Sequence, residues 1–147
     1  MEITPEITPD LEITPDKEAA IRRRLIDSNN FPRLLGFSLD LLEPRRAVLS
    51  VEVGEKLLQL QGIMHGGAIA SLIDTAVALA IAGISEPGDR FTTVELKVNY
   101  LSPIKAGRAI ADARLIKTGR RIIVADCDVS DSSGKLAAKA LVTYIRV

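Results

Sequence analysis

The longest apolar stretch of the chain runs from Ala68 to Ile84 and contains one charged residue, Asp74. Apolar residues occupy almost every side of this stretch on a helical wheel, which is typical of a helix buried in a protein core. Two glycines precede the stretch and a Glu-Pro-Gly turn follows it, which favours a helix with defined ends. A membrane span needs about 20 apolar residues and tolerates a central carboxylate poorly, so we expect a buried helix and no membrane segment.

Six shorter runs resemble β-strands because apolar and polar residues alternate in them or β-forming residues dominate. They span residues 35–42 and 47–53 before the apolar helix, and 91–101, 108–117, 120–130 and 136–147 after it. The short separations predict a hairpin for the first two runs and an antiparallel meander for the last four. In the run 91–101, alternation predicts Thr93 on one face and Val94 and Leu96 on the other.

The N-terminal part predicts a tail followed by a helix. Residues 1–16 repeat Glu-Ile-Thr-Pro three times, and residues before proline avoid the helical region, so we expect an extended surface tail or a docking arm. Residues 17–27 predict an amphipathic helix with Asp16 as its N-cap and an end before Pro32. Residues 17–147 then form a single domain. The predicted fold class is α+β, with a curved antiparallel sheet wrapped around one long buried helix.

The net charge of the 147 residues is zero, with 19 basic and 19 acidic residues, which argues against a nucleic-acid-binding protein. The charge is unevenly distributed, because residues 1–16 contain five acidic and no basic residues. The remainder therefore has a basic surplus of five. This surplus suits a small polyanionic ligand, although a solvated basic face is the default interpretation.

The chain has one histidine and one cysteine, His65 and Cys127. A single cysteine excludes a disulfide framework within the chain, and the pair argues against a Cys/His metal site, so we expect no metal. The acidic N-terminus lacks the basic start and apolar run of a signal peptide. We therefore expect a soluble, cytoplasmic protein with a reduced thiol.

The residues with the most chemical potential lie at and within the apolar helix. Free N–H groups and the helix dipole near Gly66 provide a place to stabilise an oxyanion. A carboxylate among apolar side chains is a stronger base than one in water, which suits Asp74 to general-base catalysis. The two residues are eight positions apart, about 12 Å along a helix, so one subunit cannot place both around one carbon. Two antiparallel helices can, and a catalytic role therefore predicts at least a homodimer with shared sites.

Each of these features also has a purely structural interpretation. A glycine pair before a helix is often only a tight connection, and a histidine there is often a cap or a packed polar residue. A triad of Ser71, His65 and Asp74 is disfavoured because the chain lacks a Gly-x-Ser-x-Gly elbow. The sequence also lacks a phosphate-binding loop and a dinucleotide fingerprint.

Residues 62–78 read Gly-Ile-Met-His-Gly-Gly-Ala-Ile-Ala-Ser-Leu-Ile-Asp-Thr-Ala-Val-Ala, which resembles the signature of hotdog-fold acyl-CoA thioesterases. The phenylacetate-pathway type of the 4-hydroxybenzoyl-CoA thioesterase superfamily matches best, with an aspartate nine residues after the motif histidine. Residues 92–103, Thr-Thr-Val-Glu-Leu-Lys-Val-Asn-Tyr-Leu-Ser-Pro, resemble the strand that follows in that family, and residues 111–147 resemble its last strands. The resemblance covers about residues 30–147 and implies a hotdog fold.

The resemblance also implies a role for each matching residue. Asp74 would be the general base or the nucleophile, and the Gly66 amide would polarise the thioester carbonyl. His65 would help to set that loop. Gln59, with a second glutamine two residues later as a competitor, would lie near the carbonyl and the water. Thr93 would position the water beside the carboxylate.

The reaction implied by the resemblance is hydrolysis of an acyl-CoA thioester to a free carboxylic acid and CoA. CoA is then part of the substrate, no separate cofactor is needed, and the enzyme is at least a homodimer and often a homotetramer. Lys117, Arg120 and Arg121 flank a predicted turn and are candidates for binding the CoA phosphates. A non-catalytic acyl-CoA sensor, and less favourably a hydratase or dehydratase of the same fold, are the alternatives. The sequence does not indicate which acyl group is bound.

Overall fold

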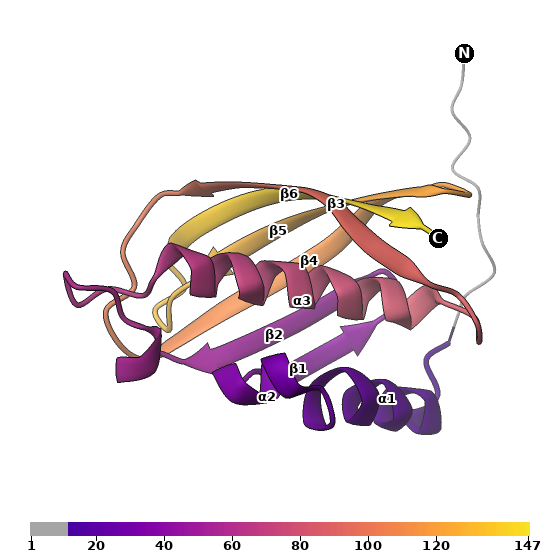
Figure 1. Cartoon of the computed structure of the whole chain (residues 1–147), viewed down its shortest axis with the longest axis horizontal. Coiled ribbons are helices and arrows are strands. Elements are labelled where there is room, and N and C mark those ends of the chain that lie inside the picture. The colour runs from indigo at the N-terminus through magenta and orange to yellow at the C-terminus, as the bar shows by residue number, and fades with distance from the viewer. Residues whose placement is uncertain (1–11) are drawn as a thin grey trace, which may run out of the picture.

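The computed structural model describes residues 12–147 of the chain (Figure 1). Residues 1–11, which include most of the predicted tail, lie outside the described residues. The helices are α1 (Pro15–Arg22), α2 (Asn30–Leu35) and α3 (Gly66–Ile84). The strands are β1 (Ser38–Glu43), β2 (Arg46–Glu52), β3 (Phe91–Tyr100), β4 (Arg108–Thr118), β5 (Ile122–Ser130) and β6 (Leu136–Arg146).

The six strands form one antiparallel sheet in the order β1-β2-β4-β5-β6-β3. Figure 1 shows α3 lying along the face of this curved sheet, with α1 and α2 next to β1. The predicted α+β class, with a sheet wrapped around one long helix and an N-terminal helix, is therefore confirmed.

The predicted four-stranded meander is wrong in one pairing. Strands β4, β5 and β6 form a meander, but β3 pairs with β6, and β4 pairs with β2. The connection from β3 to β4 is not a tight turn. It leads from the edge strand β3 past β6 and β5 to the position between β5 and β2, where β4 lies. Two hydrogen bonds of 2.7 Å hold it there, from Met64 N–H to the Ile104 carbonyl and from Val53 N–H to the Gly107 carbonyl. As a result, β3 is an edge strand, and its outer side pairs with no strand among residues 12–147.

Helix α3 supplies the centre of the core. Nine of its 19 residues are buried, and Leu72, Ile73 and Leu79 are completely inaccessible. They pack against a sheet rich in buried alanine, which allows the helix to approach closely. Within residues 12–147, α3 is the one helix long and apolar enough to cross a membrane. Half of it is buried inside the protein, as is typical of a core helix.

The N-terminal helix differs from the prediction at its start. The N-cap is Thr14, whose Oγ1 accepts a hydrogen bond of 3.2 Å from Lys17 N–H, and Asp16 lies inside the first turn. The helix widens into a π-helical turn after Arg22 and ends at Asp27, as predicted, and α2 begins as a separate helix after the extended residue Asn29. Pro32 does not stop α2, because it lies in the first helical turn, where its missing N–H is not needed.

Strand β3 carries a β-bulge at Val94, since the register with β6 shifts between Thr93 and Glu95. The bulge breaks the simple alternation. Before it, Thr93 faces α3, and after it Leu96 and Val98 pack against the core. Thr93 therefore points to the same side as Leu96, opposite to the prediction.

Candidate active site

Asp74 lies in the middle of α3 and is half-buried. Two hydroxyl groups donate to its Oδ1: Thr93 Oγ1 at 2.8 Å and Tyr144 OH at 2.7 Å. Its other oxygen, Oδ2, has no hydrogen-bond partner in the part of the chain that the structure describes. A cavity of about 200 Å³ lies beside Asp74. One carboxylate oxygen is thus fixed by the protein, and the other is available to a ligand or a water molecule.

Tyr144, on β6, is the functional residue that the sequence reasoning missed. Its side chain is 5% exposed, and its hydroxyl also donates to the Asp74 carbonyl at 3.0 Å. Burial raises the pKa of the Tyr144 phenol well above its ordinary value, so the hydroxyl remains a donor at neutral pH. A signal was present in the sequence: a tyrosine at an inward position of 136–147 needs a buried partner, and Asp74 was the unsatisfied polar group of the apolar helix.

The start of α3 forms the second part of the site. His65 is the N-cap, and its Nδ1 accepts a hydrogen bond of 2.8 Å from Gly67 N–H. This bond assigns the ring proton to Nε2. The His65 carbonyl accepts from the N–H groups of Ala68 and Ile69. The Gly66 N–H has no acceptor among residues 12–147 and is the free donor of this helix start.

A side chain at either glycine would be crowded by a neighbouring side chain. A Cβ at Gly66 would lie 3.2 Å from Cζ of Tyr100, whose hydroxyl donates to the Gly66 carbonyl at 2.9 Å. A Cβ at Gly67 would lie 3.0 Å from Nδ1 of His65. The close contacts keep side chains away from the free amide.

The structure does not bring the two parts together within one chain. Gly66 and Asp74 both belong to α3, eight residues apart, which is about 12 Å along the axis. One helix therefore keeps the two residues too far apart to act on one carbon, and the homodimer with shared sites stays a prediction.

Gln59 lies in the turn before α3 and is also separate from Asp74. Its Nε2 donates to Gln61 Oε1 at 3.3 Å, and its Oε1 accepts from Gln61 N–H at 2.5 Å. The two glutamines are thus bonded to each other at the helix-start side of the molecule, near His65.

Lys117, Arg120 and Arg121 lie on and beside the turn between β4 and β5 and are exposed. None of them forms an ion pair with a residue of the described range 12–147. This turn is at the end of the sheet where α3 ends, far from the start of α3 (Figure 1). The three predicted phosphate ligands are therefore not close to Gly66 of the same chain.

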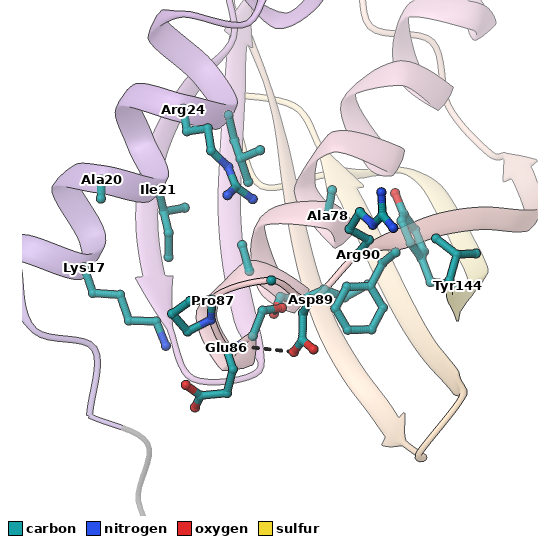
Figure 2. Close-up of a pocket in the computed structure, with 17 residues that line it drawn as sticks. Lys17, Ala20, Ile21, Arg24, Ala78, Glu86, Pro87, Asp89, Arg90 and Tyr144 are labelled. Carbon is teal, nitrogen blue, oxygen red and sulfur yellow. Dashed lines mark hydrogen bonds between the residues drawn. The ribbon is translucent and has the colours of Figure 1, made fainter.

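A second, larger cavity adjoins the cavity beside Asp74. It has a volume of about 760 Å³ and lies between α1, the last two turns of α3 and residues 85–91 (Figure 2). Leu25, Ala78 and Tyr144 line both cavities. The two cavities are therefore neighbours along α3.

Comparisons with known proteins agree with this architecture. The family model described as thioesterase superfamily matches residues 61–138. A putative esterase from Saccharolobus solfataricus is 33% identical, over 82% of this chain and 80% of that protein. The medium/long-chain acyl-CoA thioesterase YigI from Escherichia coli is 31% identical, over 78% of this chain and 84% of that one.

The match extends to solved structures. A mutant of the phenylacetic acid degradation protein PaaI from Thermus thermophilus superposes with a TM-score of 0.74 at 32% identity. The superposition covers 81% of this chain and 100% of the PaaI chain. With the family model and the relatives, this establishes that the chain belongs to the thioesterase superfamily, as a thioesterase of the hotdog fold.

Proposed function

We propose that the protein hydrolyses an acyl-CoA thioester to a free carboxylic acid and CoA, with Asp74 as the catalytic carboxylate. The observation that carries the proposal is the state of Asp74: two hydroxyls hold Oδ1, Oδ2 has no hydrogen-bond partner among residues 12–147, and the residue lines a cavity. The names of relatives such as the medium/long-chain acyl-CoA thioesterase support acyl-CoA as the substrate.

Two chemical routes are consistent with this carboxylate. As a general base, Asp74 accepts a proton from a water molecule, whose oxygen bonds to the thioester carbon. As a nucleophile, Asp74 bonds to that carbon itself, and water then hydrolyses the resulting anhydride. In both routes the C–S bond breaks, the thiolate leaves and takes up a proton, and no metal is needed. A single turnover in isotopically labelled water, followed by mass analysis of Asp74, separates the two routes.

The oxyanion that forms on the carbonyl needs a donor, and the free Gly66 N–H at a helix start supplies one. The 12 Å separation requires that this donor come from the partner subunit. The unpaired edge of β3 supports such a dimer, because two copies of an edge strand pair across a two-fold axis. That axis places the two α3 helices antiparallel, with Asp74 of one beside Gly66 of the other.

The remaining predicted residues support this centre. Thr93 orients Asp74, His65 holds the helix start, and Gln59 lies on the helix-start side, where it reaches the thioester from the partner. The basic group Lys117, Arg120 and Arg121 is proposed to bind the CoA phosphates, and tetramer formation and a cytoplasmic location remain predictions.

The direct test is Asp74→Asn, which keeps the shape of the side chain. We expect thiol release from acyl-CoA to fall by about 100- to 10,000-fold, the usual effect of losing a general base. Unchanged thiol release would exclude Asp74 as the catalytic carboxylate. If the wild-type protein binds acyl-CoA thioesters but releases thiol from none of the acyl-CoA thioesters tested, the sensor alternative is correct.

The shared site is tested by a hybrid dimer. Gly66→Pro removes the N–H at the first helical position, where proline fits and where His65 already has the extended backbone that precedes proline. Asp74→Asn and Gly66→Pro subunits, carrying different tags and purified together, form one doubly defective and one intact site. We expect about half of the wild-type activity per hybrid. An inactive hybrid would show that each site belongs to one chain.

A further inference from the structure

The larger cavity described above, which we call the α1–α3 groove, has walls of two kinds. Its inner wall is apolar and comes from Ile21 of α1, Leu25 of the π-helical turn that follows, Ala78 and Ile81 of α3, and Phe91 of β3. Figure 2 shows Ile21 extending from α1 into this space, with Ala78 on the opposite side.

The charged residues of the groove come from its rim. Lys17 belongs to α1, Arg24 to the π-helical turn that follows it, and Glu86, Asp89 and Arg90 to the connection between α3 and β3. Arg24, Glu86 and Arg90 are exposed, so their charges remain in water, and Asp89 is paired with Arg146. An occupant that fits the inner wall is apolar along its length.

The groove shares part of its wall with the cavity at Asp74. Leu25, Ala78 and Tyr144 line both spaces, and the Tyr144 hydroxyl is bonded to Asp74. The groove therefore begins next to the carboxylate and runs away from it along α3.

The length of the groove along α3 determines which acyl chain lengths it can hold. Along the helix axis Ala78 is about 6 Å from Asp74, Ala82 is about 12 Å away and Ser85 about 17 Å, and these three residues line the groove. A volume of about 760 Å³ far exceeds the needs of an acetyl or a butyryl group. Small side chains at Ala78 and Ala82 keep the groove open.

We propose that the α1–α3 groove holds the hydrocarbon chain of a long-chain fatty acyl thioester, and that α1 is a specificity-determining element of this enzyme. This inference rests on the proposed thioester hydrolysis at Asp74. Position along α3 then sets the accepted chain length, with Ala78 close to the thioester and Ala82 one turn further away.

The test is to block the groove at two depths with Ala78→Phe and Ala82→Phe. Values of kcat/KM are measured for acetyl-, octanoyl- and palmitoyl-CoA. The matched control is Ala19→Phe, since Ala19 is an exposed residue of α1 that does not line the groove. Each buried methylene is worth roughly fourfold in binding, so exclusion of four or more changes a ratio by at least about 100-fold.

We expect Ala78→Phe to lower both the octanoyl-to-acetyl and the palmitoyl-to-acetyl ratio by at least about 100-fold. Ala82→Phe lowers the palmitoyl-to-octanoyl and palmitoyl-to-acetyl ratios but leaves the octanoyl-to-acetyl ratio unchanged, and Ala19→Phe changes none of the three. If Ala78→Phe does not fold, the Ala82→Phe ratio still decides the matter.

Equal losses for all three substrates, or ratios unchanged in both groove variants, would overturn the inference. A wild-type enzyme that hydrolyses only short-chain or aryl thioesters would also overturn it, while leaving thioester hydrolysis itself intact. A wild-type protein that releases thiol from no acyl-CoA would refute the proposed function instead.

Discussion

Replacing Tyr144 with phenylalanine removes one hydroxyl group and leaves the ring in place. In the folded protein that hydroxyl donates to Asp74 at two points, to Oδ1 at 2.7 Å and to the carbonyl at 3.0 Å. After the substitution, Thr93 is the remaining donor to Oδ1. The perturbation is therefore confined to the orientation of the carboxylate.

The structure sets the size of the expected effects. A buried hydrogen bond to a charged group contributes about 2 kcal/mol, so Tyr144→Phe lowers the free energy of unfolding by that amount. For a chain of this size, this corresponds to a decrease of about 6 °C in Tm. A carboxylate that swings by about 1 Å loses roughly 100-fold in rate, so we expect kcat to fall by about 10- to 100-fold.

The assay combines thiol-release kinetics with thermal unfolding at fixed protein concentration. The variants are Tyr144→Phe, Thr93→Val and the double variant. Because both hydroxyls act on one oxygen, the loss of kcat in the double variant is smaller than the product of the single losses. A kcat within twofold of the wild-type value for Tyr144→Phe would refute the view that Tyr144 positions Asp74. Strictly multiplicative losses would show that the two hydroxyls act independently.

Three further predictions concern other parts of the molecule. Gly66→Pro lowers kcat by about 100- to 1,000-fold because it removes the oxyanion donor. Gly66→Ala, which crowds Tyr100 but keeps the N–H, lowers kcat by less. Equal decreases in the two variants would show that crowding alone causes the loss. Burial raises the pKa of the Cys127 thiol, so we expect iodoacetamide at pH 8.5 to leave this residue unmodified in the native protein, as measured by mass spectrometry. Modification of Cys127 without denaturant would contradict this. Because the unfolded chain ionises this thiol above about pH 8.5 while the fold keeps it neutral, the contribution of this group to stability falls as pH rises past that value. Deletion of residues 1–11 leaves Tm unchanged, whereas a deletion that also removes Thr14 lowers it through the lost cap of α1. If the shorter deletion lowers a salt-sensitive KM, the acidic tail competes for the basic surface.

The sequence predicted the elements of the fold more successfully than their arrangement. Apolar runs and turn residues are local, so α3 and all six strands lie close to their predicted ranges. The pairing of β3 with β6 depends on a connection held by Ile104 and Gly107, and no local pattern specifies it. The end of the first helix at Asp27 was predicted, whereas the separate helix α2, which contains Pro32 in its first turn, was not.

The candidate site was predicted in part and for two different reasons. Asp74 and Gly66 stood out as residues of unusual type in an apolar helix, and the structure places both on α3. Thr93 was named through a family resemblance, while alternation alone predicted the wrong face for it. The bulge at Val94, which aims Thr93 at Asp74, leaves no signature in alternation. Tyr144 was missed because its contact with Asp74 depends on the register of β6.

Tyr144 also has a consequence for how binding and catalysis are related. Its ring is a wall of the α1–α3 groove, and its hydroxyl holds the carboxylate of Asp74. Occupancy of the groove and orientation of Asp74 therefore share one side chain, and two equilibria that share a group are thermodynamically linked in both directions. An acyl chain that packs on the ring stabilises the oriented carboxylate, and an oriented carboxylate increases the affinity for the acyl chain. In the proposed binding mode, the affinity for a long acyl chain therefore depends on the orientation of Asp74.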